Sequence, residues 1–133
     1  MDNTYYIKIN KGENLMEELS NFSAKKNCCG SFFGIGAAST VTISTYIAKK
    51  AEFLDHTVTG MLEMFSLTGN ISLDNNKQPV VHAHAGFSYL NKHNDIDIIA
   101  GDLKEAQISY TAEITFMPLS SELNREFDEA AGI

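Results

Sequence analysis

The chain has 133 residues, of which 44% are hydrophobic and 20% charged, and this length and composition suit one domain with a single buried core. A formal net charge of −7 opposes non-specific binding to nucleic-acid phosphates. No apolar stretch approaches the roughly 20 residues of a membrane span, and the start lacks the pattern of a signal peptide. We therefore expect a cytoplasmic protein with no membrane partner.

The first part of the chain is predicted to form a strand followed by a helix. Residues 4–10 form the strand, and Asn14 and Glu17 have the spacing of a capping box at the start of the helix. An apolar stripe follows at helical spacing and consists of Leu15, Leu19 and Phe22. Gly30 is the predicted end of this helix, which we expect to pack against a sheet.

The rest of the chain is dominated by strand patterns. Period-two alternation starts near Ser31, and the small residues 34–38 predict a bulge or a close approach between backbones. Residues 60–73 and 78–89 predict a long hairpin joined by the polar turn 74–77, and residues 91–95 form another polar loop. Residues 106–117 alternate cleanly, as in a half-buried strand with one polar face.

These elements predict an α+β fold in which a mainly antiparallel sheet is flanked by one main helix. We expect about six or seven strands in total. Residues 119–129 are predicted to form a short closing helix. Because the sequence shows no linker, repeat or low-complexity tract, we expect residues 1–133 to form one domain.

Two histidines in alternate positions, His82 and His84, carry the strongest chemical signal. On a strand they project from one face about 6.6–7 Å apart, so they can converge on one divalent ion. This pair supplies only half of a metal site, because a first-row ion also needs a third ligand such as His, Asp or Glu. The alternative is a pair of surface or hydrogen-bonded histidines.

Two acidic residues are further candidates. Glu63 shares its predicted strand face with Met61, Phe65 and Leu67. A carboxylate in such an apolar row must be paired, hydrogen-bonded, protonated or metal-bound, or else reach solvent at an edge. Asp102, taken alone, is a turn or strand-edge aspartate that follows two small residues. The residues themselves do not decide whether the Glu63 carboxylate has a partner or reaches solvent.

Several blocks taken together resemble the PPC (plant and prokaryote conserved) domain. They are Gly34-Ile35-Gly36-Ala37-Ala38, the run from Gly60 to Ile71, Pro79-Val80-Val81-His82-Ala83-His84, Gly101-Asp102-Leu103 and Glu113-Ile114. The resemblance covers about residues 5–119 and leaves residues 120–133 as a C-terminal tail or short helix. It implies a single α+β domain that assembles as a homotrimer, and in some members a metal ion at the histidines.

The resemblance also assigns roles to residues of this chain. His82 and His84 match the family His-x-His block, Glu63 matches the family glutamate, and Asp102 stands where the family has a histidine. Aspartate is a legitimate ligand, so the resemblance implies a site made of His82, His84 and Asp102 that takes zinc first, or iron or manganese.

Three functions follow as hypotheses. We prefer a homotrimeric binding module, not an enzyme, with a divalent metal or small-molecule site at His82, His84 and Asp102. The second is a DNA-binding protein in transcription regulation, as prokaryotic members are often labelled, although a net charge of −7 and the lack of an AT-hook oppose it. The third is a metal-dependent, hydrolase-like enzyme with Glu63 as general base.

Overall fold

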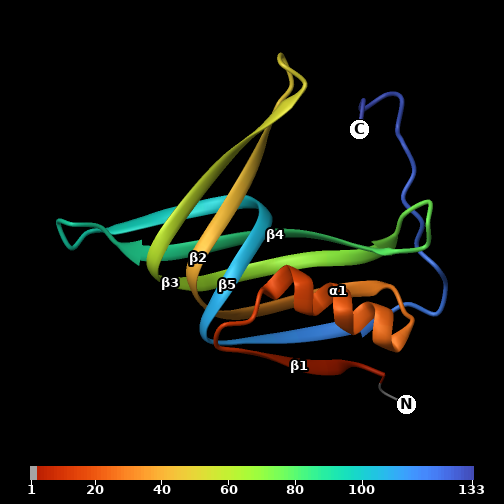
Figure 1. Cartoon of the computed structure of the whole chain (residues 1–133), viewed down its shortest axis with the longest axis horizontal. Coiled ribbons are helices and arrows are strands. Elements are labelled where there is room, and N and C mark those ends of the chain that lie inside the picture. Colours follow the sequence, from red (N-terminus) through yellow and green to blue (C-terminus); the bar gives the residue numbers. More distant parts are fainter. Residues whose placement is uncertain (1–2) are drawn as a thin grey trace.

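The computed structural model describes residues 3–133, which form five strands and one helix (Figure 1). In chain order the elements are β1 (Tyr5–Asn10), α1 (Leu15–Lys26), β2 (Gly30–Ile47), β3 (Glu52–Leu73), β4 (Pro79–Leu90) and β5 (Ile96–Pro118). This confirms the α+β class and the single domain. There are fewer strands than the expected six or seven because β2, β3 and β5 are 18, 22 and 23 residues long and bend instead of ending.

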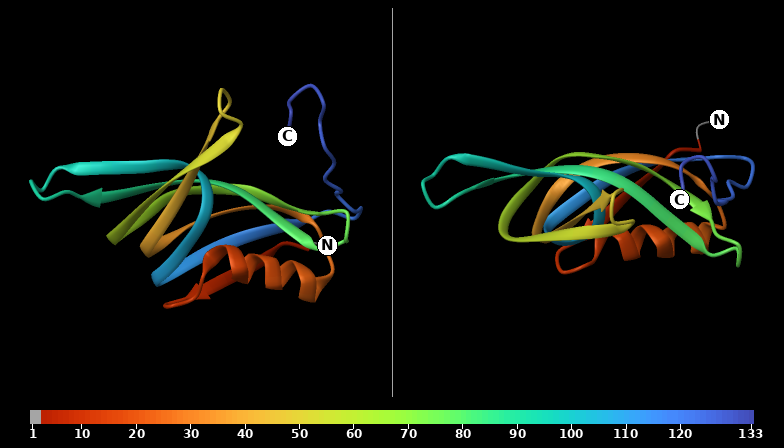
Figure 2. Two further views of the ribbon diagram at one scale, coloured as in Figure 1. Left: turned by 45° about the horizontal axis from the view of Figure 1, so that its top comes forward. Right: turned by 90° about the horizontal axis from the view of Figure 1, so that it is seen from above.

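The sheet curls until its strands close on one another. Its order is β1-β5-β2-β3-β4, and β4 also pairs with β5. Strand β5 makes this closure possible by changing partner: it pairs with β4 up to Asp102 and with β2 from Asp102 onward. The hairpins β2–β3 and β4–β5 extend away from the closed part in different directions (Figures 1 and 2).

Helix α1 begins as the sequence predicts and ends earlier than expected. The side chain of Asn14 accepts a hydrogen bond from the Glu17 backbone N–H over 3.2 Å, which satisfies a free amide of the first turn. The helix ends at Lys26, because Asn27 takes a left-handed conformation with φ of 52° and caps it. The prediction that Gly30 ends the helix is wrong, since Gly30 is the first residue of β2. At 12 residues, the single helix of the described chain falls short of a membrane crossing.

The core fills the inner face of the curled sheet and is covered by α1. Leu15 and Leu19 of the helix stripe are fully buried, and the Phe22 ring lies 5.3 Å from both the Tyr5 and the Phe116 rings. The largest buried side chains of the sheet are Phe87, Phe116, Ile9, Leu62, Met64, Leu67, Ile71, Ile108, Ile114 and Val41. Burial of each such side chain contributes about 1.5–3 kcal/mol. The inner face is therefore occupied mainly by apolar packing, and the charged side chains lie outside this core.

The small residues 34–38 behave as predicted. The register between β2 and β3 shifts between Phe33 and Gly36, which is the expected irregularity. A Cβ at Gly36 would lie 2.6 Å from the Thr111 carbonyl oxygen and 2.7 Å from the Ala112 Cα. The backbones of β2 and β5 thus approach more closely here than a side chain would permit.

The predicted closing helix at residues 119–129 does not form. The Leu73 N–H donates to the Leu123 carbonyl over 2.7 Å, and the Arg125 N–H donates to the Leu73 carbonyl over 2.8 Å. These backbone groups pair with the end of β3 and so cannot pair within a helix. The tail instead runs beside the β3–β4 turn before it leaves the domain (Figure 1).

Candidate metal centre

Strand β4 presents His82 and His84 on the outer face of the sheet, as the alternation predicts. The intervening Ala83 and the following Ala85 point inward and are 1% and 5% exposed. The histidine side chains are 47% and 66% exposed. Because successive side chains of a strand point to opposite faces, the two alanines pack into the core and both imidazoles lie on the outer surface.

Asp102 reaches the histidines because β5 changes partner at this residue. It lies opposite His84 on β4 and opposite Ser44 on β2. The preceding Gly101 has a φ of 144°, a conformation that residues with a side chain rarely adopt, and a Cβ there would lie 2.9 Å from the Ile43 Cγ2. Glycine at this corner lets β5 turn from one partner to the other, and the turn carries the Asp102 carboxylate over β4.

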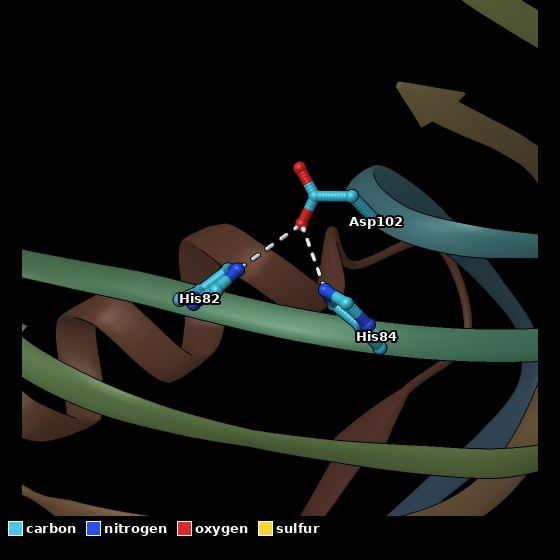
Figure 3. A group of neighbouring side chains, drawn as sticks. All are labelled: His82, His84 and Asp102. Atoms are coloured by element: carbon cyan, nitrogen blue, oxygen red, sulfur yellow. Dashed lines mark ion pairs between the residues drawn. The ribbon is translucent and has the colours of Figure 1, made fainter. Parts of the chain in front are cut away.

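The three side chains converge on one point (Figure 3). One Asp102 carboxylate oxygen, Oδ1, lies 3.5 Å from the His82 Nε2 and 3.9 Å from the His84 Nε2. The imidazole rings are 5.3 Å apart and nearly perpendicular, at 81°. One ligand atom from each residue lies within 4.8 Å of the other two.

This donor set fits a divalent transition metal. Zinc accepts nitrogen and carboxylate ligands at about 2.0–2.2 Å in a tetrahedron, which places the ligand atoms roughly 3.3 Å apart. The separations of 3.5 and 3.9 Å to the Asp102 Oδ1, and the limit of 4.8 Å on every pair of ligand atoms, are wider than that value, so the exposed side chains would rotate inward to hold an ion. Two histidines and one carboxylate also suit iron, and the exposed position leaves room for a fourth ligand.

A second polar cluster lies on the β2 side of Asp102. The Asp55 carboxylate accepts hydrogen bonds from Lys104 Nζ over 2.6 Å and from the Ser44 hydroxyl over 2.8 Å. The Lys104 hydrogen bond, followed by that of Ser44, lowers the pKa of Asp55 below its ordinary value, and Asp55 in turn raises the pKa of Lys104. The positive charge of Lys104 is therefore compensated by Asp55.

The lowered pKa of Asp55 predicts an acid-dependent contribution to stability. Its folded pKa lies below the ordinary value of 3.8, so the folded state binds fewer protons and the contribution is present above pH 3.8. It is lost as the pH falls through the folded pKa. We expect Asp55→Asn to lower the free energy of unfolding at neutral pH, with a difference from wild type that shrinks below pH 3.8, as measured by urea unfolding along a pH series.

The control for this series is Asp97→Asn, since Asp97 is exposed and makes no ion pair among residues 3–133. Added salt should reduce the effect of Asp55→Asn because the pair with Lys104 is exposed to solvent. A difference between Asp55→Asn and wild type that is constant from neutral to acid pH would contradict the assignment.

Glu63 lies on the outer face but apart from this centre. It is opposite Ser88 on β4, four residues along that strand from His84, which corresponds to roughly 13 Å. Its side chain is exposed and reaches solvent, but the predicted edge position is wrong, because β3 lies between β2 and β4 and Glu63 projects from the face of the sheet. Within one chain, Glu63 and the His82, His84 and Asp102 cluster form two separate features.

The outer face also carries large apolar side chains on β1, β2 and β3. We call Tyr6, Phe33, Ile35, Met61 and Phe65 the outer apolar patch, and they are 48% to 72% exposed. Four of them, Tyr6, Phe33, Ile35 and Phe65, line one shallow hollow of about 400 Å³. Contiguous exposed apolar surface of this kind is typical of an interaction site.

Comparison with known proteins supports the resemblance read from the sequence. The profile of the Plants and Prokaryotes Conserved (PCC) domain matches residues 1–120. No curated protein matches the chain. Several solved structures do match over nearly its whole length.

Three of these structures are informative. A Bacteroides thetaiotaomicron protein, provisionally described as DNA-binding, is 27% identical with a TM-score of 0.87 and covers 100% of this chain and 90% of its own. An Archaeoglobus fulgidus protein described as metal-containing is 26% identical with a TM-score of 0.86, over 98% and 90% of the two chains. A Pyrococcus horikoshii plant- and prokaryote-conserved protein is 27% identical with a TM-score of 0.82, over 96% and 86%.

Proposed function

Because the chain belongs to the Plants and Prokaryotes Conserved (PCC) domain family, we propose that it is a homotrimeric binding module that holds one divalent metal ion per subunit. His82, His84 and Asp102 are the ligands, and zinc is the preferred ion ahead of iron and manganese. One observation carries this proposal: two imidazoles and a carboxylate lie within 4.8 Å of one another. The similar Archaeoglobus fulgidus protein is described as metal-containing, which supports it.

The geometry favours binding over turnover. A metal held by three protein ligands retains an open position, which attracts a small ligand with a free oxygen or nitrogen atom. Hydrolysis also needs a general base within hydrogen-bond reach of the attacking water, and Glu63 lies roughly 13 Å along the sheet. In one subunit, the acidic residue that the enzyme hypothesis requires is therefore far from the ligands.

The outer apolar patch is the surface proposed for self-association. Each copy in a threefold assembly offers an equivalent patch, and burial of apolar surface contributes roughly 25 cal/mol per Å². Tyr6, Phe33 and Ile35 lie on β1 and β2, elements that the centre at His82, His84 and Asp102 does not use. Phe65 on β3 lies against Gly86 of β4, two residues from His84, so the patch borders the centre without including its ligands.

DNA binding is a weaker candidate for this chain. It is suggested by the Bacteroides thetaiotaomicron relative, which is provisionally described as DNA-binding. A trimer triples the net charge of −7, and a polyanion is repelled by it. Two of the cations, Lys77 and Lys104, are also compensated by Glu122 and Asp55.

Native mass spectrometry of protein purified without chelator tests assembly and metal content together. We expect the mass of three chains plus three metal ions. Phe65→Glu, which places a charge in the outer apolar patch, should shift the population towards monomers by desolvation cost and charge repulsion. The matched control is Phe127→Glu, because Phe127 is 68% exposed on the tail. A metal-free monomer in the wild type would contradict the proposal.

A further inference from the structure

The C-terminal tail is fixed to the end of β3 next to the metal centre. Leu73 exchanges backbone hydrogen bonds with Leu123 and Arg125, and these residues pair in the manner of a short parallel strand. Lys77 in the β3–β4 turn adds hydrogen bonds to Glu122 over 3.1 Å and to Asn124 over 3.0 Å. These four hydrogen bonds hold residues 122–125 beside the end of β3.

This attachment brings Arg125 close to the proposed metal ligands. Its Nη2 donates to the Asn70 Oδ1 over 3.1 Å. Asn70 on β3 lies directly opposite His82 on β4, and their Cβ atoms are therefore about 4.5–5.5 Å apart on the same face. The guanidinium approaches the centre from the β3 side, whereas the Asp102 carboxylate approaches it from the β5 side.

The charge of Arg125 is available to a ligand. Arg125 is the single arginine of the sequence, and no carboxylate forms an ion pair with it among residues 3–133. Asn70, its partner, is neutral. The lysines beside the same region, Lys77 and Lys104, are paired with Glu122 and Asp55. Arg125 is thus an uncompensated cation in a chain of net charge −7.

We propose, as an extension of the proposed metal site, that Arg125 recognises the anionic group of a small ligand bound to the metal. A divalent ion and the Asp102 carboxylate together carry a net positive charge, and the guanidinium adds one more. Its planar fork matches the two oxygens of a carboxylate or a phosphate. The ligand class is therefore a small carboxylate or phosphate, with one oxygen on the metal and others towards Arg125.

The test uses the full chain loaded with Co²⁺, whose visible absorption reports a change in its ligands. Inorganic phosphate and succinate are titrated separately, which distinguishes a phosphate ligand from a carboxylate ligand. Loss of a charge-assisted hydrogen bond corresponds to about tenfold in affinity, so Arg125→Gln should weaken binding of the preferred anion by about tenfold or more. Co²⁺ stoichiometry should not change.

Lys92→Gln is the matched control, because it removes one positive charge from the exposed β4–β5 loop. It should change the affinity for either anion by less than about twofold. Equal effects of Arg125→Gln and Lys92→Gln, or no spectral response to either anion, would overturn the inference and leave the metal site intact. Failure of the wild type to bind Co²⁺ would instead overturn the metal site, and the inference with it.

Discussion

Replacement of both His82 and His84 by alanine is expected to abolish metal binding and to leave the fold intact. The variant loses two of the three proposed ligands. Removal of a residue that only hydrogen-bonds to a metal ligand lowers metal affinity roughly 10–100-fold, so the loss of metal affinity here should be larger. Both side chains are about half exposed or more, at 47% and 66%, and neither contributes to the core. The free energy of unfolding without metal should therefore stay within about 0.5 kcal/mol of wild type.

Elemental analysis and Zn²⁺ titration measure the first effect, and urea unfolding in the presence of a chelator measures the second. The matched control is the double variant His56→Ala/His93→Ala, which removes the two exposed histidines that lie outside the centre. Full metal content in the His82→Ala/His84→Ala variant would show that the ion binds elsewhere. Equal loss in the control variant would show a non-specific effect of histidine number.

Gly69→Ala is expected to cause a large loss of stability and to disturb the centre from beneath. A Cβ at Gly69 would collide with the His82 carbonyl oxygen and lie 2.6 Å from the Phe32 ring. Gly69 lies opposite Ala83, the residue between the two histidines, and its neighbours cannot yield without moving β4. Such overpacking costs about 1–3 kcal/mol, measurable as a lower midpoint in urea unfolding.

Gly86→Ala is the comparison for this variant. Its Cβ would meet the Phe65 ring at 2.6 Å, and in the isolated subunit that ring is 53% exposed, so it has room to move away from the added methyl group; the two variants are therefore compared on dissociated subunits. We expect a cost below about 1 kcal/mol for Gly86→Ala. If Gly69→Ala proved no less stable than Gly86→Ala, the close approach of β3 and β4 at His82 would not be as described.

The elements that sequence predicted well are those decided by neighbouring residues. The start of α1 follows from the Asn14 cap, and the hairpin of β3 and β4 follows from two apolar runs around one polar turn. The predicted end of α1 at Gly30 is too late because Asn27 takes the left-handed conformation that is usual for glycine. In each case a local interaction explains the outcome.

Features set by distant residues were not predictable. The closure of the sheet depends on β5 changing partner at Asp102, which only the assembled strands define. The sequence predicts a helix at residues 119–129, but backbone groups of this tail pair with Leu73, some 50 residues earlier in the chain. Local propensity at residues 119–129 carried no sign of this pairing.

The candidate centre also combines features set by neighbouring residues with features set by distant ones. The period of two placed His82 and His84 on one face without further information. Asp102 joined them only through the family resemblance, because its position arises from Gly101 and the pairing of β5 with β4. Arg125 is the single arginine of the sequence, and only the pairing of the tail with β3 places it near the histidines.

Anomalous X-ray scattering from a crystal of the zinc-loaded protein tests the central claim most directly. We expect one peak per chain, above the zinc absorption edge, at bonding distance from the His82 and His84 imidazoles and the Asp102 carboxylate. A peak bound to other residues, or none between these three side chains at saturating zinc, would contradict the account.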